Sequence, residues 1–437
     1  MATTSPDQEI AAREPTAKLD VEYQTLDQGI SRFVNTSQGS FKTLRVPDSA
    51  SADPESDWWL DFLRGGAEYP EQIRSRLGVV DLFCGSGGLS LGAATAARSI
   101  GLELEHEFAA DADPQALGIY SVNHRPRFSA TESVSNLVSF RISSRGGQAS
   151  YSHTPQIIHE ELALRKGQVD LLLAGPPCQG HSTLNNQTRF NDPRNLLYLA
   201  VPAVAVALEA PAVVIENVPG VTASKQGVVR TTVELLKSNG YNVTSHVLRS
   251  DDLGWPQTRK RFFLVATRDW AAIPLSVVVD ALKREARPVS WALQDVLESN
   301  EESIMTELPT MSAVNQGRID YLHDNDLYNL PNEQRPKCHQ GGTTYTAVYG
   351  RMYWDRPAPT ITTGFMTPGR GRYVHPLKRR TLAPREAARI QGFPDFYRFE
   401  TASEALGRSA IAKGIGDAVP SILGFAATLS ALGNRPA

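Results

Sequence analysis

The 437-residue sequence contains few cysteines, no long apolar run and no overall excess of basic residues. Cys84, Cys178 and Cys338 are an odd number without CxxC spacing, which argues against a disulfide framework or a zinc cluster. The longest apolar stretch, residues 196–208, is too short to span a bilayer and contains a proline. No basic segment followed by an apolar one opens the chain. We therefore expect a cytoplasmic protein without a metal site or membrane association.

The charge balance gives only a weak indication of a partner. The net charge is −3 at pH 7, so composition alone does not predict nucleic-acid binding. Basic residues nevertheless gather in residues 366–380, which contain Arg370, Arg372 and three further cations but no acid. This run is either a solvated face or a local surface for a polyanion.

Residues 78–270 alternate short apolar runs with longer amphipathic segments. Buried parallel strands that end in turns are expected at 78–83, 108–113, 169–177 and 212–220, with a further strand at 259–268. Helices are expected at 196–210, 228–240, 383–393 and 419–433. This order predicts an α/β fold with a Rossmann-like, doubly wound, mostly parallel sheet covered on both faces.

The pattern divides the chain into four parts. Residues 1–77 are expected to form a partly disordered N-terminal arm, because residues 1–40 are polar with weak periodicity. Residues 78–274 contain the predicted sheet. Regularity is lost over 275–375, which predicts a smaller, β-rich or irregular domain, and residues 376–437 return to the first domain.

A glycine-rich turn, "VVDLFCGSGGLSLG" at 79–92, joins a predicted strand to a helix. Gly85, Gly87 and Gly88 allow close approach of a ligand, and the helix N-terminus offers free N–H groups. Asp111 lies at the end of the next predicted strand, where an acid can accept both ribose hydroxyls. The pair predicts an adenosine-type cofactor without separating NAD from S-adenosylmethionine.

Three further strand ends carry polar side chains. Cys178 follows a rigid Gly-Pro-Pro turn in "DLLLAGPPCQGHS" (170–182), so its sulfur is expected to be presented rather than packed. Glu216 ends the apolar run of "VVIENVPG" (213–220), where burial should raise its pKa. Arg259 and Arg261 in "PQTRKRFFLVA" (256–266) are two residues apart, so they share one face of a strand.

Together and in this order, these motifs make the chain resemble the DNA (cytosine-5) methyltransferase family of the bacterial type. The resemblance covers about residues 78–435 and includes "DPRNLL", "RTLAPREAARIQGFPD" and "GIGDAVP". It implies transfer of a methyl group from S-adenosylmethionine to C5 of a cytosine flipped out of a specific duplex DNA site. It assigns residues 275–375 to target recognition.

The resemblance also implies the roles of individual residues. Cys178 is expected to add to cytosine C6 as a thiolate, Glu216 to contact N3, Arg261 to hold the ring oxygen, and Arg259 to support Cys178 and Glu216 from behind. Cofactor contacts are expected from Phe83, Gly85, Gly87, Gly88, Asp111, Ala112, Glu132, Leu197 and Asp417. DNA contacts are expected from Gln179, Ser182, Thr360, Arg370 and Arg372.

One departure and several alternatives bear on this interpretation. Asp417 stands where the family usually has Asn, beside the expected cofactor site. A transfer-RNA methyltransferase is disfavoured by the size of the second domain, and an inactive scaffolding relative by the presence of Cys178, Glu216 and Arg261. An NAD-dependent dehydrogenase would leave "GPPCQ" and "ENV" unexplained. We expect a monomer, with a restriction endonuclease for the same site as a further partner.

Overall fold

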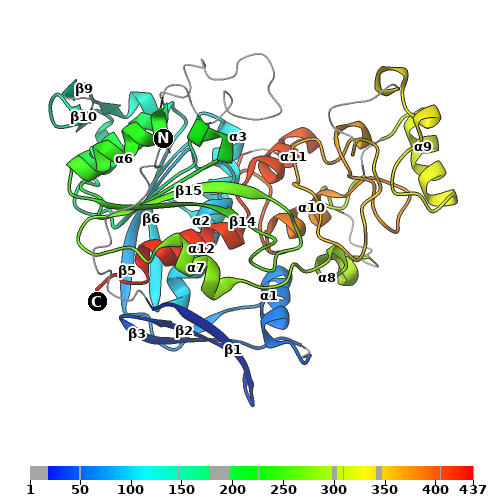
Figure 1. Cartoon of the computed structure of the whole chain (residues 1–437), viewed down its shortest axis with the longest axis horizontal. Helices are drawn as coiled ribbons and strands as arrows, with labels where there is room; N and C mark the ends of the chain where they lie inside the picture. The colour runs from blue at the N-terminus through cyan, green and yellow to red at the C-terminus, as the bar shows by residue number, and fades with distance from the viewer. Residues whose placement is uncertain are drawn as a thin grey trace, which may run out of the picture.

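A seven-stranded central sheet organises the protein (Figure 1). The computed structural model describes residues 18–48, 51–145, 148–177, 197–223, 227–297, 303–308, 310–340, 347–403 and 405–436. The strand order is β14–β15–β13–β12–β5–β6–β7, in which the last five run parallel and β15 is antiparallel to both of its neighbours, β13 and β14. The strands are β5 (Ser75–Leu82), β6 (Leu102–Ala110), β7 (Phe128–Ala130), β12 (Leu171–Ala174), β13 (Ala212–Asn217), β14 (Asn242–Arg249) and β15 (Lys260–Thr267). The predicted α/β sheet is confirmed.

Both faces of this sheet are buried under helices. On β12, Leu171 and Leu173 pack with one hydrophobic cluster, while Leu172 and Ala174 pack with the other, as alternating strand side chains require. The first face is covered by α2 (Gly88–Ser99), α7 (Leu275–Leu282) and α12 (Ser421–Leu432), and the second by α5 (Leu197–Leu208) and α6 (Val228–Ser238). Helix α3 (Pro114–His124) follows β6. Unbroken apolar strands are therefore explained by double-sided burial.

The described residues of the N-terminal segment, 18–48 and 51–77, form an ordered part of the fold, which corrects the expectation of a loose arm over residues 18–40. An antiparallel sheet is formed by β1 (Asp20–Leu26), β2 (Gly29–Thr36), β3 (Gly39–Arg45) and β4 (Tyr69–Pro70). Helix α1 (Pro54–Arg64) lies between β3 and β4 in the chain. Ile30 and Val34 are fully buried in the same cluster as α12. Residues 1–17 lie outside the described residues.

A hairpin within residues 141–155 lies on the second face of the sheet. Its strands are β9 (Ile142–Arg145) and β10 (Gln148–Tyr151), flanked by β8 (Val138–Ser139), β11 (Gln156–Ile157) and α4 (Glu160–Ala163). The backbone N–H of Ala149 donates to the Glu234 carboxylate of α6 at 2.8 Å. The hairpin is thereby attached to the sheet-covering layer.

Residues 283–380, here called the small region, lie to one side of the sheet (Figure 1). This region contains helices α8 (Val289–Leu293) and α9 (Ala313–Asp324), and its described residues form isolated β-bridges but no extended strand. A separate core contains Ile319, Leu322, Leu330 and Val374. Of the two predicted alternatives, the irregular one is found. Helix α7 packs on the sheet instead, because Leu275 and Val278 are fully buried there.

The C-terminal part returns to the sheet through α10 (Pro384–Gln391), α11 (Arg408–Asp417) and α12. By length and composition the segment Arg408–Leu432 could cross a membrane, but 89% of its apolar window is buried inside the protein. Gly92 of α2 and Gly424 of α12 lie at the contact of these helices, where an added Cβ would collide with backbone. The segment is therefore core structure.

Candidate active site

Glu216 and Arg261 form an ion pair where two neighbouring strands meet the carboxyl edge of the sheet. Glu216 lies in β13 and is 8% exposed, and Arg261 lies near the start of the antiparallel β15. Arg261 Nε donates to Glu216 Oε1 at 2.7 Å. Burial raises the pKa of the Glu216 carboxyl, although the positive charges of Arg261 and Arg259 oppose this shift. The predicted raised pKa of Glu216 is therefore found together with its cationic partner.

Arg259 is buried behind this pair and reaches two other elements. Its Nη1 donates to the Ile361 carbonyl at 2.6 Å and its Nη2 to the Gly416 carbonyl at 3.1 Å. Its charge lowers the pKa of Glu216, in agreement with support of Glu216 from behind. The hydrogen bonds show an additional role, because Arg259 joins the small region to the end of α11.

The turn that leads to Cys178 lies directly beside Glu216. A Cβ placed on Gly175 would lie 3.7 Å from Glu216 Oε2. Asn217 Nδ2 donates to the Pro176 carbonyl at 3.1 Å, and the Gly175 N–H donates to the Leu82 carbonyl at 3.2 Å. The turn is thus fixed to both neighbouring strands, whereas Cys178, Gln179 and Ser182 lie outside the described residues.

The glycine-rich turn lies at the same edge, after β5. Gly85 and Gly87 have φ values of 53° and 87°, a left-handed conformation that favours glycine. A Cβ on Gly87 would collide with His124 Nε2 and the Tyr397 hydroxyl. Gly88 then begins α2, whose N-cap has no side-chain hydrogen bond. The start of α2 is therefore not capped by a side chain.

Asp111 adjoins this turn. The Gly85 N–H donates to Asp111 Oδ2 at 2.8 Å, and the Asp113 N–H donates to Asp111 Oδ1 at 2.8 Å. Burial raises the pKa of Asp111, while these backbone hydrogen bonds and Lys413 lower it. Each carboxylate oxygen has two lone pairs, so both can also accept a ribose hydroxyl.

The other expected cofactor residues surround this group to different degrees. The backbone N–H of Asp111 donates to the Ala130 carbonyl at 3.3 Å, which brings the end of β7 and the following Glu132 toward Asp111. Ala112 follows Asp111, and Phe83 has a φ of 56° beside the glycine turn. Leu197 is half-buried at the start of α5. Glu132 is exposed.

Asp417 ends α11 and is paired with a lysine. Lys413 Nζ lies 2.9 Å from Asp417 Oδ2 and 3.3 Å from Asp113 Oδ2. The carboxylates raise the pKa of Lys413 against the opposing effect of burial. The acid that replaces the usual Asn is thus neutralised close to Asp111.

The three expected DNA contacts of the small region have different surroundings. The Thr360 hydroxyl donates to the Thr258 carbonyl at 3.4 Å. Arg370 is exposed and makes no ion pair with the described residues. Arg372 instead donates to the carbonyls of Tyr328 and Arg351 at 2.7 and 2.9 Å. Arg372 therefore belongs to the internal structure of the region, whereas Arg370 stays a predicted DNA contact.

Sequence reasoning missed a buried polar junction next to the active site. Gln257 Nε2 donates to Gln391 Oε1 at 2.9 Å, its Oε1 accepts from the Ile361 N–H at 3.1 Å, and Gln391 Nε2 donates to the Ala418 carbonyl at 2.5 Å. These bonds connect the start of β15, the small region and the turn before α12. Both glutamines occur in the quoted motifs, which was the available signal.

Comparison with known proteins decides what this edge of the sheet belongs to. A family model described as C-5 cytosine-specific DNA methylase matches residues 77–429, most of the chain. The chain belongs to this family. It is therefore a DNA cytosine-5 methyltransferase, and the alternative of an NAD-dependent dehydrogenase is wrong.

Similar sequences carry corresponding names. The chain is 39% identical over 404 residues to "Type II methyltransferase M1.BsuMI" of Bacillus subtilis (strain 168), covering 90% of this chain and 91% of that protein. It is 30% identical over 354 residues to "Type II methylase M.HgiDII" of Herpetosiphon aurantiacus, covering 79% and 92%.

Solved structures support the fold. A DNA modification methyltransferase encoded within an E. coli prophage has a TM-score of 0.52 at 22% identity, covering 82% of this chain and all of that chain. The Dnmt2 methyltransferase of S. pombe has a TM-score of 0.51 at 16% identity, covering 81% and 98%. At these identities the likeness establishes the architecture of the methyltransferase sheet.

Proposed function

We propose that this DNA cytosine-5 methyltransferase acts on a cytosine flipped out of a specific duplex site, through a covalent bond between Cys178 and C6. The observation that carries the proposal is the position of Glu216. Its buried carboxyl, with a raised pKa, is held by Arg261 at 2.7 Å beside the turn that precedes Cys178 in the chain. An acid and a cation beside this turn suit N3 and O2 of a cytosine, and the proposal assigns C6 of the same base to the Cys178 thiol.

Each group then has one step. The Cys178 thiolate forms a bond to C6, and the electron pair of the C5–C6 double bond moves into a C4–C5 double bond. The electron pair of the C4–N3 double bond then moves to N3, where Glu216 supplies a proton or a hydrogen bond. Arg261 stabilises the charge on the ring oxygen. C5 is now nucleophilic and is methylated; loss of the C5 proton then expels the thiolate and restores the ring. Base flipping costs a few kcal/mol, which binding of the DNA must supply.

S-adenosylmethionine fits the second half of the site. The group supplies an electrophilic methyl on a sulfonium. Gly85, Gly87 and Gly88 leave a cradle without side chains at the start of α2, and Asp111 has lone pairs for the ribose. Ala112, Phe83, Leu197 and Glu132 would complete the adenosine contacts, with Asp417 nearby. Loss of affinity by about 1–3 kcal/mol in Asp111→Ala, measured calorimetrically, would test the ribose contact.

DNA would lie between the sheet and the small region. We propose that the small region is the target-recognition part of the enzyme, because Arg259 and Gln257 attach residues 358–361 directly beside Glu216. Base contacts from it would specify the site, while Thr360, Arg370, Gln179 and Ser182 would serve phosphate or neighbouring base contacts. The catalytic part comprises residues 75–282 and 381–432.

The biological setting follows from the relatives. Two are named Type II methyltransferase or methylase, which supports a restriction-modification role with an endonuclease for the same site. We propose a monomeric cytoplasmic enzyme associated with the nucleoid.

Expression in a host without cytosine methylation tests the proposal. Sequencing of bisulfite-treated host DNA should reveal 5-methylcytosine at one sequence context with the wild-type gene, and none with Cys178→Ala. Bisulfite sequencing of transfer RNA from the same cells distinguishes the alternative substrate. Methylation by Cys178→Ala would contradict the mechanism, and its absence with the wild type would indicate an inactive relative.

A further inference from the structure

The N-terminal segment contributes a helix that lies against the chain entering the small region. Helix α1 extends over 11 residues, from Pro54 to Arg64. The connecting chain runs from α7 through Arg284 and Arg287 to α8 and Asp295. Helix α1 lies below α10 and beside α8 in Figure 1, and the family match begins only at residue 77. Helix α1 itself thus lies outside the part of the chain that carries the proposed chemistry.

Ion pairs hold α1 to this connecting chain at both ends. In its first turn, Glu55 Oε2 lies 2.5 Å from Arg284 Nε, and Glu55 Oε1 lies 3.7 Å from Arg287 Nη2. In its last turn, Arg64 Nε lies 2.8 Å from Asp295 Oδ2. Nine helical residues separate Glu55 from Arg64, or about 14 Å along the axis. A segment held at two points this far apart cannot pivot about either one.

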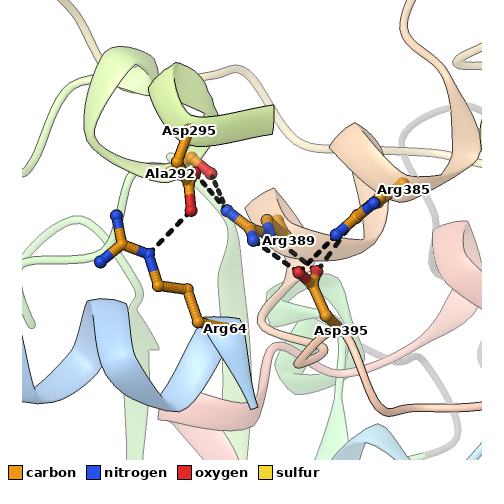
Figure 2. Close-up of polar contacts among 6 residues, drawn as sticks. All are labelled: Arg64, Ala292, Asp295, Arg385, Arg389 and Asp395. Carbon is orange, nitrogen blue, oxygen red and sulfur yellow. Dashed lines mark hydrogen bonds and ion pairs between the residues drawn. The ribbon is translucent and has the colours of Figure 1, made fainter. Parts of the chain in front are cut away.

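The second of these contacts continues into α10, as Figure 2 shows. Asp295 also accepts from Arg389 Nη1 at 2.5 Å, and Arg389 Nη2 donates to Asp395 Oδ2 at 2.6 Å. Burial would raise the pKa of Asp295, but the hydrogen bond from Arg64 and the charge of Arg389 hold it below its usual range. The Asp395 N–H donates to the Leu63 carbonyl of α1 at 2.8 Å, which closes the connection.

Aromatic side chains pack between the ion pairs at the two ends of α1. The Trp59 ring of α1 meets Trp255 edge-on at 5.8 Å, and Trp255 meets Trp291 of α8 at 5.6 Å. Trp255 Nε1 donates to the Ile390 carbonyl of α10 at 2.9 Å. Trp255 stands two residues before Gln257, which binds residue 361 of the small region. Helix α1 therefore packs, through Trp59 and Trp255, against the chain segment that binds the small region.

We propose that α1 is a brace that fixes the small region against the catalytic sheet, with Glu55 and Arg64 as positioning residues for DNA engagement. This inference rests on the proposed function of the small region. It assigns to the N-terminal segment a role in forming the DNA-binding cleft, distinct from cofactor binding and methyl transfer. If these contacts of α1 are weakened, the small region can take more positions relative to the sheet. DNA then binds only the fraction of molecules in the position that allows methylation.

The test separates DNA engagement from chemistry. Steady-state methylation is measured on a duplex oligonucleotide carrying the site found by bisulfite sequencing, for Arg64→Ala, Arg64→Lys and the double variant Glu55→Gln/Arg64→Ala. Half-exposed ion pairs contribute modestly, so Arg64→Ala should raise KM for DNA about 3-fold and the double variant about 10-fold. Turnover with saturating DNA and calorimetric S-adenosylmethionine affinity should stay within about 2-fold. Arg64→Lys should restore KM.

Arg76→Ala is the matched control. Arg76 also forms exposed ion pairs, with Glu103 and Glu105 at 3.2 Å, on the sheet itself. This variant should leave KM for DNA unchanged. An unchanged KM for DNA in the double variant would overturn the proposed brace. So would a rise in KM for DNA that is accompanied by equal losses of thermal stability and of cofactor affinity. Failure of the wild type to methylate any DNA would instead overturn the proposed function.

Discussion

Site residues on the sheet stand at strand ends anchored by apolar cores, whereas the small region is cross-linked by arginines bonded to backbone carbonyls. Glu216 follows four buried apolar residues of β13, and Asp111 follows Ala109 and Ala110 of β6. In the small region, Arg372 binds the carbonyls of Tyr328 and Arg351. Apolar packing positions reactive groups precisely. Polar cross-links hold an irregular chain, whose surface can differ between enzymes that recognise different DNA sequences.

The largest expected effect concerns the sheet. Glu216→Gln removes the acid while keeping the size of the side chain, so turnover should fall by about 10²- to 10⁴-fold. S-adenosylmethionine affinity, measured by calorimetry, should change little, because Glu216 lies on β13 and the glycine turn on β5. Retention of more than a tenth of wild-type turnover would show that the acid is elsewhere.

A buried acid beneath the glycine turn gives the next effect. Asp81 is 1% exposed, and Ser90 Oγ donates to its Oδ2 at 2.6 Å. Burial raises the pKa of Asp81 to about 7. The folded protein therefore holds a proton that the unfolded chain releases near pH 4, so this contribution to stability is lost as pH rises toward 7.

Asp81→Asn should remove the loss of stability that the wild type shows as pH rises from about 4 to 7. Above pH 7 the variant should be more stable than the wild type by about 2–4 kcal/mol, and near pH 4 the two should converge. Urea unfolding across this pH range measures the difference, with exposed Asp269→Asn as the control. A variant that is less stable than the wild type at pH 8 would contradict the assignment of a costly buried charge.

Arg372→Met tests the small region as a polar cross-linked structure. Loss of its guanidinium leaves carbonyls of Tyr328 and Arg351 without these donors, a cost of about 1–3 kcal/mol. Limited proteolysis should then cleave within residues 310–380 while the sheet survives. Unchanged protease resistance would show that the apolar core of the small region is sufficient.

Arg370→Met should have the smallest effect on structure, because this exposed side chain has no ion pair among the described residues. Thermal stability should remain that of the wild type. DNA affinity should fall for all sequences alike, and the slope of log affinity against log salt should decrease by about 1 if one phosphate contact is lost. A change in sequence preference instead would make Arg370 a base-reading residue.

The sheet could be predicted from sequence because its information is local. Each strand is an apolar run, and polar motifs directly follow it, so Glu216 and Asp111 could be placed at one edge without coordinates. Arg261 could also be placed, since it begins an apolar run of its own.

The N-terminal sheet could not be predicted because its burial depends on distant partners. Arg32 is fully buried, ion-paired with Glu68 and placed 4.7 Å from the Trp58 ring. A strand containing a buried arginine resembles a polar arm until residues about 30 positions later are known to cover it. The role of Arg372 was missed for the same reason, because carbonyl acceptors have no signature in a sequence.

The most direct test of the central claim is to trap the bond between Cys178 and cytosine. The enzyme is incubated with S-adenosylmethionine and a duplex whose target cytosine carries fluorine at C5, which cannot leave as the proton does. Intact-mass measurement should show one protein joined to one DNA strand, with the linkage mapped to the Cys178 peptide and absent in Cys178→Ser. Methylation of ordinary DNA without any trapped adduct, or an adduct at another residue, would contradict the account.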